Sequence, residues 1–259
     1  MENLKIIKIG GKLIDEESEF RQALKVFAGL PAPKILVHGG GASATAISKQ
    51  MGIKPNLQDG RRITDADALQ VVQMVYAGLI NKNIVAGLQA LKCPALGLSG
   101  ADGNSILAVK RPVRKIDYGY VGDVTEVNAT AISKLITAGF VPVFCALTHD
   151  GKGQMLNTNA DTIAAEIAVG LSNLYRTQLF FCFEKDGVLK DIDEPDSVIP
   201  HITKDSYKIL KQNKIIAQGM LPKIDNAFQS LDKGVSEVCI GHFNALTNSD
   251  SVRTRLTVK

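Results

Sequence analysis

Two glycine clusters follow apolar runs near the start of the chain. Lys8-Ile9-Gly10-Gly11 ends the first run, and His38-Gly39-Gly40-Gly41 ends the second, just before an Ala/Ser-rich segment that predicts a helix from about Ala42. Glycine lets backbone N–H groups approach an anion closely, and a helix start adds partial positive charge. One such corner alone would indicate only a tight turn. The two together predict a phosphate or carboxylate site between them.

The second cluster also fits a dinucleotide-binding fingerprint. Residues 39–44 match G-x-G-x-x-A, and Asp59 lies ~20 residues on, where such proteins carry an acidic ribose ligand. The match is weak, because Asp59 stands in a turn-like Gln-Asp-Gly-Arg-Arg sequence instead of at the end of a second strand. The fingerprint also assigns no function to residues 8–11. A P-loop is excluded, because Gly11-Lys12 is followed by Leu13 instead of Ser or Thr. A nicotinamide-dependent dehydrogenase remains an alternative.

Short apolar runs that alternate with helical patterns must position these corners. Strands are predicted over residues 4–9, 34–38, 95–98, 141–147, 178–183 and 238–241. Helices are predicted over residues 65–77, with Thr64 as N-cap, and over 129–138, 160–171 and 220–233. This alternation is typical of a three-layer α/β/α sandwich with a mainly parallel central sheet, whose ligands gather at the carboxyl ends of the strands.

Three further segments are irregular. Gly, Asp and Pro punctuation predicts hairpins over residues 53–63 and 106–126, which could act as lids, and an exposed loop over residues 185–200.

Composition narrows the class of protein. The 259 residues are 45% hydrophobic and 22% charged, and 30 Lys/Arg are interleaved with 26 Asp/Glu, so no nucleic-acid partner is required. The four cysteines form no C-x-x-C pair and the four histidines lack metal-ligand spacing, so Cys145 and Cys182 are interpreted as buried apolar residues and His38 as a support for the glycine loop. No signal peptide or membrane span is evident, which predicts a soluble cytoplasmic protein.

Five motifs resemble those of the acetylglutamate kinase branch of the amino acid kinase family, in the same order along nearly the whole chain. They are Lys8-x-Gly-Gly, His38-Gly39-Gly40-Gly41, Gly60-Arg61-Arg62-Ile63-Thr64, Asn157-Thr158-Asn159-Ala160-Asp161 and Gly219-Met220-Leu221-Pro222-Lys223. The third and fourth separate this branch from carbamate kinases, aspartokinases and uridylate kinases. The resemblance implies the amino acid kinase fold and ATP-dependent phosphorylation of the γ-carboxylate of N-acetyl-L-glutamate, the second step of arginine biosynthesis.

The resemblance also implies catalytic roles. A glutamate-type carboxylate with a pKa of about 4.3 is already ionised at pH 7, so the reaction needs positioning and charge neutralisation instead of a general base. Lys8 is expected to contact the transferring phosphoryl group, Lys223 to stabilise charge toward the leaving ADP, and Asp161 to hold both lysines. Gly10 and Gly11 are expected at the phosphate. Mg²⁺ is expected to arrive on the ATP phosphates, without protein metal ligands.

Substrate-binding residues follow in the same way. Arg62 is expected to bind the α-carboxylate bidentately, Asn157 the N-acyl amide or α-carboxylate region, and the N–H groups of Gly40 and Gly41 the reacting group. Asn159 either joins them or only caps the helix that starts at residue 160.

The resemblance divides the chain into two lobes of a single domain. Residues 1–172 are expected to bind the acylglutamate and to dimerise, and residues 173–259 to bind ATP. Residues 182–187 replace the family's Ser/Thr-Asp-Val-x-Gly sequence, so no adenosine contact is assigned. Because the first predicted strand begins at Leu4, no N-terminal helix of the kind found in arginine-inhibited hexamers is expected. The prediction is an arginine-insensitive homodimer that pairs through residues 65–91.

Two further alternatives stay open. The extra cation Arg61 beside Arg62 could serve the second carboxylate of N-succinyl-L-glutamate. A noncatalytic amino-acid or nucleotide sensor with the kinase fold is another class, although the presence of Lys8, Asp161 and Lys223 argues against it.

Overall fold

An eight-stranded sheet forms the centre of the computed structural model, which describes residues 1–58, 60–191, 193–213, 215–216, 220–247 and 251–258. Across the sheet the strands are β12 (His201–Thr203), β14 (Thr254–Thr257), β13 (Glu237–Gly241), β11 (Arg176–Cys182), β1 (Asn3–Ile9), β2 (Lys34–His38), β8 (Val141–Phe144) and β5 (Ala95–Leu98). β14 runs antiparallel to β13, whereas the other described neighbours pair in parallel. The predicted α/β class with a mainly parallel sheet is confirmed.

The strand register brings the two glycine corners to one edge of the sheet. In β1, Lys8 pairs with Val37 of β2 on one side and with Phe181 of β11 on the other. Parallel strands in this register end together, so the corners after β1 and β2 and the segment after β11 meet at the carboxyl edge. The apolar side chains of β1 and β2 are almost fully buried, and this burial fixes the register.

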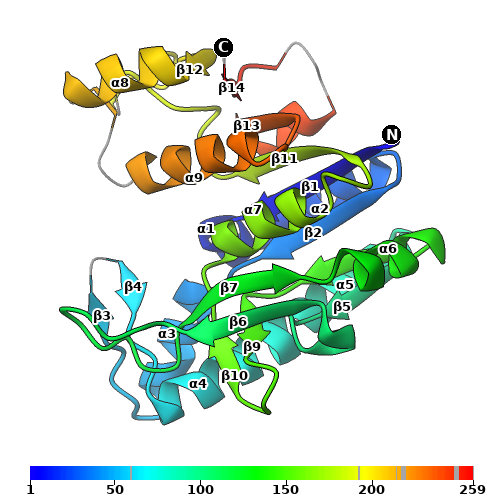
Figure 1. Cartoon of the computed structure of the whole chain (residues 1–259), viewed down its shortest axis with the longest axis vertical. Helices are drawn as coiled ribbons and strands as arrows, with labels where there is room; N and C mark the ends of the chain where they lie inside the picture. The colour runs from blue at the N-terminus through cyan, green and yellow to red at the C-terminus, as the bar shows by residue number, and fades with distance from the viewer. Residues whose placement is uncertain (59, 192, 214, 217–219, 248–250, 259) are drawn as a thin grey trace.

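Helices cover the sheet in two groups. α7 (Ala160–Gly170) packs on β1, β2 and β11, and α9 (Leu221–Asp232) lies beside α7. α2 (Glu17–Gly29) packs against α5 (Asn81–Ala90), which contacts β5 and β8. Figure 1 shows α8 (Lys204–Gln212) with β12 at the top of the molecule, and α3 (Gly41–Gln50) with α4 (Ala66–Val72) at the bottom. Other described helices are α1 (Gly11–Asp15), α6 (Ala129–Thr137) and the short 3-10 helices η2 (Asp102–Asn104) and η4 (Phe243–Leu246).

Two smaller sheets lie in the lower half of Figure 1. β3 (Leu57–Gln58) and β4 (Arg61–Arg62) form one hairpin, while β6 (Ile106–Lys110) and β7 (Gly122–Val127) pair within a sheet that also holds β9 (Leu147–His149) and β10 (Met155–Asn157). Both predicted hairpins are confirmed. The Thr64 backbone ties them together, since its N–H donates to Tyr118 O at 2.9 Å and its carbonyl accepts from Tyr120 N at 2.7 Å.

Several predicted boundaries were wrong. The strand predicted over residues 141–147 ends at Phe144 as β8, and Leu147 begins a separate strand, β9. The helix from residue 66 continues past residue 77 through a π-helical segment, η1 (Gln73–Ile80), into α5. Asp65, not Thr64, is the N-cap, because the Asp65 carboxylate accepts the Ala68 N–H at 2.8 Å while Thr64 is buried against the second hairpin. The loop at 185–200 contains no described helix or strand, although Val188 and Ile199 anchor its ends in the core.

The continuous helix Ala66–Ala90 is long and apolar enough, by length and composition alone, to cross a membrane. However, it packs on β5, β8 and α2, and Ile84 and Leu88 within it are fully buried. These contacts are those of a core helix in a globular domain.

Candidate active site

A buried ion pair stands at the carboxyl edge of the sheet. The Lys8 ammonium, at the end of β1, lies 2.7 Å from Asp161 Oδ1 in the first turn of α7, and the two side chains are only 10% and 13% exposed. Asn159 fixes this turn, because its side-chain oxygen accepts the N–H groups of Asp161 at 2.8 Å and Thr162 at 3.1 Å. Asn159 is therefore a helix cap here, and Asp161 is held facing Lys8.

Lys223 brings a second cation to the same carboxylate. Burial tends to raise the pKa of Asp161, but the charges of Lys8 and Lys223 and the hydrogen bond from Lys8 outweigh it, so the pKa is lowered. Burial lowers the pKa of Lys223, and the attraction of Asp161 and Glu184 offsets part of that effect. The structure thus brings together the three predicted catalytic residues, two cations around one anion.

The glycine corners border this cluster. A Cβ on Gly10 would lie 3.8 Å from Lys8 Nζ, so the Gly10 backbone stands beside the ammonium. Gly11 is the first residue of α1 and Gly41 the first of α3, and a Cβ on Gly41 would meet nothing within 4 Å. Gly41 therefore faces open space. Gly40 is enclosed, because a Cβ there would come within 2.3 Å of Ile80 Cδ1.

Arg62 reaches the second glycine corner from the β3–β4 hairpin. It is 8% exposed, and its Nη2 donates to Gly41 O at 3.0 Å and to Thr45 Oγ1 at 2.7 Å. Asn157 lies at the end of β10, and its side-chain amide donates to Thr64 Oγ1 at 3.0 Å. Thr64 is two residues after Arg62 in the chain. The predicted substrate residues Gly40, Gly41 and Arg62 are thus brought together, with Asn157 on the adjoining sheet. Arg61 is exposed and pairs with Gln58.

His38 supports the corner as an uncharged group. Its Nδ1 lies 2.8 Å from Gly39 O and its Nε2 lies 3.1 Å from the Asn81 amide nitrogen, so the ring donates at Nδ1 and accepts at Nε2. Burial lowers the pKa of His38 to about 4. Its predicted structural role agrees with these contacts, because both ring nitrogens are engaged in hydrogen bonds to the protein and neither is free to exchange a proton with a substrate.

Sequence reasoning missed four neighbours of the site. Thr45, Tyr76, Asn81 and Phe183 lie in segments of helical or apolar pattern that gave no local sign of function. Asp59 and Gly219, named in the sequence analysis, fall outside the described residues. Within the described ranges, no group of three or more His, Cys, Asp or Glu residues is arranged to hold a metal ion.

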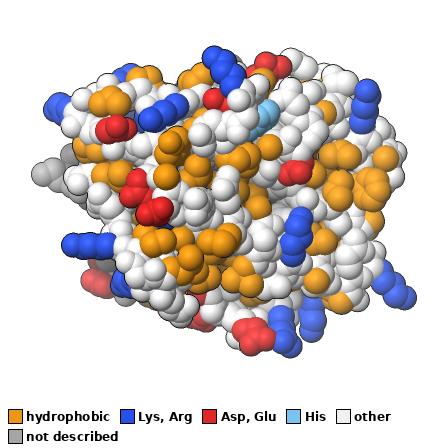
Figure 2. Space-filling model, turned by 90° about the horizontal axis from the view of Figure 1, so that it is seen from below, with side chains coloured by type: hydrophobic (Ala, Val, Ile, Leu, Met, Phe, Trp, Pro, Cys, Tyr) orange, Lys and Arg blue, Asp and Glu red, His pale blue; other side chains and the backbone are white. Residues whose placement is uncertain are grey.

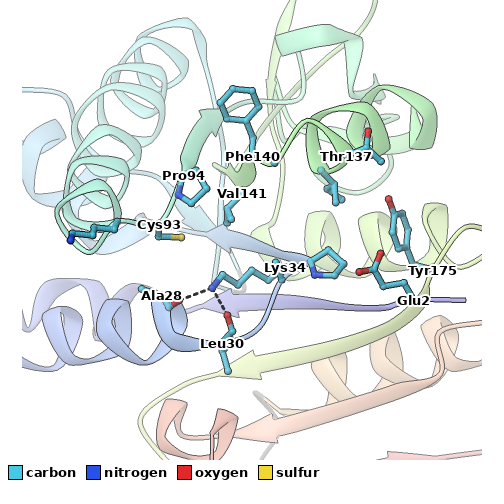
Figure 3. A pocket seen from close by; sticks show the side chains of 15 residues that line it. Glu2, Ala28, Leu30, Lys34, Cys93, Pro94, Thr137, Phe140, Val141 and Tyr175 are labelled. Atoms are coloured by element: carbon cyan, nitrogen blue, oxygen red, sulfur yellow. Dashed lines mark hydrogen bonds between the residues drawn. The ribbon is translucent and has the colours of Figure 1, made fainter.

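A cavity of about 310 Å³ lies at the opposite, amino-terminal end of the strands (Figure 3). Lys34, at the start of β2, lines it and donates to Ala28 O at 2.7 Å and Leu30 O at 2.6 Å. These carbonyls belong to the end of α2, so the buried ammonium caps that helix. The cavity is separate from the Lys8–Asp161–Lys223 cluster.

The chain belongs to the amino acid kinase family, whose sequence model matches residues 3–242. It is 52% identical over 254 residues to an acetylglutamate kinase of Bacteroides thetaiotaomicron, covering 98% of this chain and 99% of that protein. It is 53% identical to an acetylglutamate kinase of Cytophaga hutchinsonii, over 93% of this chain and 91% of that protein. It is 36% identical to an acetylglutamate kinase of Methanopyrus kandleri, over 94% of this chain and 96% of that protein. The resemblance inferred from the five motifs is confirmed, and with it the kinase class.

Solved structures share the fold. A structure of smu.665 from Streptococcus mutans UA159 superposes with a TM-score of 0.80 at 27% identity over 99% of both chains. The carbamate kinase of Giardia lamblia bound to AMP-PNP gives 0.74 at 13% identity, over 100% of this chain and 99% of that one. An N-acetylglutamate synthase from Neisseria gonorrhoeae gives 0.82 at 21% identity, over 99% of this chain and 59% of that one. The last two show the common fold alone.

Proposed function

We propose that the chain transfers the γ-phosphoryl group of ATP to the side-chain carboxylate of N-acetyl-L-glutamate, a step of arginine biosynthesis. The observation that carries the proposal is the placement of Lys8 and Lys223 around Asp161, beside two glycine corners. The names of the acetylglutamate kinases that are 36–53% identical to the chain support the same substrate.

The proposed chemistry is a direct displacement at phosphorus. A γ-carboxylate oxygen forms a bond to the γ-phosphorus while the bond to the ADP oxygen breaks, and ADP leaves with that electron pair. Lys8 neutralises the transferring group and Lys223 the charge that grows toward ADP. Asp161 keeps both ammonium groups in place and takes no proton, because its lowered pKa leaves it ionised at neutral pH.

The substrate is proposed to lie between the second glycine corner and the small sheets. Arg62 has guanidinium N–H groups beyond the Nη2 that binds Gly41 and Thr45, and these suit a carboxylate. Asn157 stands close by with an amide suited to the N-acyl region. Gly10, Gly11, Gly40 and Gly41 offer backbone N–H groups around the reacting oxygens.

ATP is proposed to bind to the lobe formed by residues 173–259, which carries Lys223. It would bring Mg²⁺ on its phosphates, so that water and phosphate oxygens form most of the metal's shell. Residues 1–172 would form the acylglutamate lobe. The two lobes meet where β1 pairs with β11.

A cytoplasmic homodimer is proposed, with an interface on the helical region 65–91. Met74 and Leu79 in that region are 51% and 49% exposed, although their neighbours Val75 and Ile80 are buried. Apolar side chains also gather on the underside of the molecule in Figure 2. Sedimentation at micromolar concentration should give a dimer that Met74→Glu converts to monomer; a monomeric wild-type chain would contradict this part of the proposal.

The reaction is tested by trapping the acyl phosphate with hydroxylamine after incubation with ATP and Mg²⁺. N-acetylglutamate, N-succinylglutamate, free glutamate and aspartate are offered in parallel. Hydroxamate from N-acetylglutamate above the other acceptors is expected. A preference for the succinyl compound would correct the acyl group, and absence of product together with absence of ATP binding would favour a noncatalytic sensor.

A further inference from the structure

The Lys223 ammonium lies over the ring of Phe183, 5.4 Å from the ring centroid. This separation is within the ~6 Å range of a cation–π interaction. The two residues come from different elements, because Phe183 directly follows β11 and Lys223 belongs to the first turn of α9. An aromatic ring therefore joins the carboxyl edge of the central sheet to the helix that carries a proposed catalytic cation.

The Phe183 ring is fixed to the sheet. The Phe183 N–H donates to Gly241 O at 3.1 Å, next to the last pair of β11 and β13. The Phe183 side chain is partly buried and packs against the hydrophobic core. The carbonyl oxygen of the preceding residue, Cys182, would lie 3.6 Å from a Cβ on Gly10, so the segment borders the first glycine corner. The ring is thus an ordered surface beside the site.

The backbone of Lys223 is tied down as well, but its side chain is long. The Tyr207 hydroxyl of α8 donates to Asp225 Oδ1 at 2.9 Å, which joins the beginning of α9 to the neighbouring helix. A lysine ammonium, however, is a point charge on a flexible stem. The charges of Asp161 and Glu184 attract it, yet a charge alone does not select one conformation of the stem. Contact with a flat ring restricts the ammonium to one face and excludes water from that face.

We propose that Phe183 is a positioning residue for phosphoryl transfer, whose ring holds the Lys223 ammonium where negative charge develops toward ADP. The inference rests on the function proposed above, in which Lys223 stabilises that charge. Electrostatic stabilisation of a transition state is most effective when the charged group is in place beforehand, because no reorganisation is then needed during the reaction. Phe183 acts through Lys223 and needs no contact with either substrate.

The test is Phe183→Leu, which removes the aromatic face and keeps an apolar side chain against the core. We expect kcat for acyl phosphate formation to fall about tenfold, within the range for loss of a partly desolvated cation–π contact. The KM for N-acetylglutamate should change less than about twofold, because Phe183 lies in the lobe proposed to bind ATP. Phe183→Tyr keeps an aromatic face and should retain kcat within about twofold of wild type. Urea unfolding measures any loss of packing separately.

A second background tests whether the effect passes through the lysine. In Lys223→Ala, whose remaining activity is measured at high enzyme concentration, Phe183→Leu should cause no further fall in kcat. A ring that contacted ATP directly, or that served only to pack the core, would lower kcat in both backgrounds.

Phe27→Leu is the matched control at the opposite end of the sheet. The Lys34 ammonium lies over the Phe27 ring, 5.2 Å from its centroid, so the same substitution removes the same kind of contact from a lysine outside the site. Phe27 is 2% exposed, and its replacement should reduce the free energy of unfolding while leaving kcat within about twofold of wild type.

The outcomes separate this inference from the proposed function. An active wild-type enzyme whose kcat is unmoved by Phe183→Leu would overturn the role of Phe183 alone. An equal fall in Phe183→Leu and Phe183→Tyr, or an undiminished effect of Phe183→Leu in the Lys223→Ala background, would overturn it as well. A wild-type chain that forms no acyl phosphate from N-acetylglutamate would overturn the proposed function, and the inference with it.

Discussion

Replacing Lys8 with Met removes one charge from the centre of the site and keeps most of the side-chain volume. The ammonium lies 2.7 Å from Asp161, and both side chains are nearly excluded from water, so no solvent cation can replace it in the same position. Loss of one preorganised charge stabiliser typically costs about 2.7–4 kcal/mol in the transition state. We therefore expect kcat to fall at least ~100-fold. The KM for ATP should change little, because Lys8 acts on the transferring group.

The assay is hydroxamate formation under saturating ATP, Mg²⁺ and N-acetylglutamate, supported by single-turnover measurements. Lys34→Met is the matched control, because Lys34 is also a buried lysine, 5% exposed, but caps α2 at the other end of the sheet. Lys34→Met should reduce the free energy of unfolding and leave kcat within about twofold of wild type, since its carbonyl partners lie outside the site. A Lys8→Met enzyme with kcat within tenfold of wild type would refute the assigned role, and so would an equal loss in the control.

Three further outcomes are expected. Lys223→Ala should lower kcat at least ~100-fold with a modest change in the KM for ATP, measured by the same assay; a change confined to KM would contradict the role given to this lysine. Arg62→Ala should mainly raise the KM for the acylglutamate, and calorimetry should show the same loss of affinity. Burial lowers the pKa of His38 to about 4, so the unfolded chain takes up a proton first as the pH falls below about 6.5. The free energy of unfolding should therefore fall progressively between about pH 6.5 and pH 4, by up to about 3 kcal/mol. Urea unfolding of the wild type and of His38→Asn at several pH values measures this change. Parallel pH profiles for the two proteins would count against the assignment.

Two strands of the central sheet could be predicted with their exact bounds, β2 over residues 34–38 and β5 over residues 95–98. Each holds a short, mostly apolar run between turn signals, and such a run is typical of a strand. The short strands β12 and β14 lacked such a signal. They hold only three and four residues, and their pairing depends on partners distant in the chain.

The long helix shows why boundaries were harder to predict than elements. The apolar pattern after Asp65 predicted a helix, but its course through η1 to Ala90 depends on packing against Gly40, β5 and β8. The site residues divide in the same way, into those marked by local sequence and those placed by tertiary packing. Lys8 and Asp161 could be assigned through motifs, whereas Tyr76 and Asn81 gain their place only from tertiary contacts with residues 14 and 43 positions earlier in the chain.

The charge balance of the cluster itself favours a phosphoryl-transfer site over a ligand sensor. Lys8 and Lys223 share one carboxylate, and burial of Lys223 lowers its pKa by more than Asp161 and Glu184 recover. The Phe183 ring, 5.4 Å from the Lys223 ammonium, adds a cation–π attraction. Two like charges in a poorly hydrated site are costly unless an anion joins them. An incoming phosphoryl group would supply that anion and would raise the pKa of Lys223, so both lysines would be charged when negative charge develops on the transferring group.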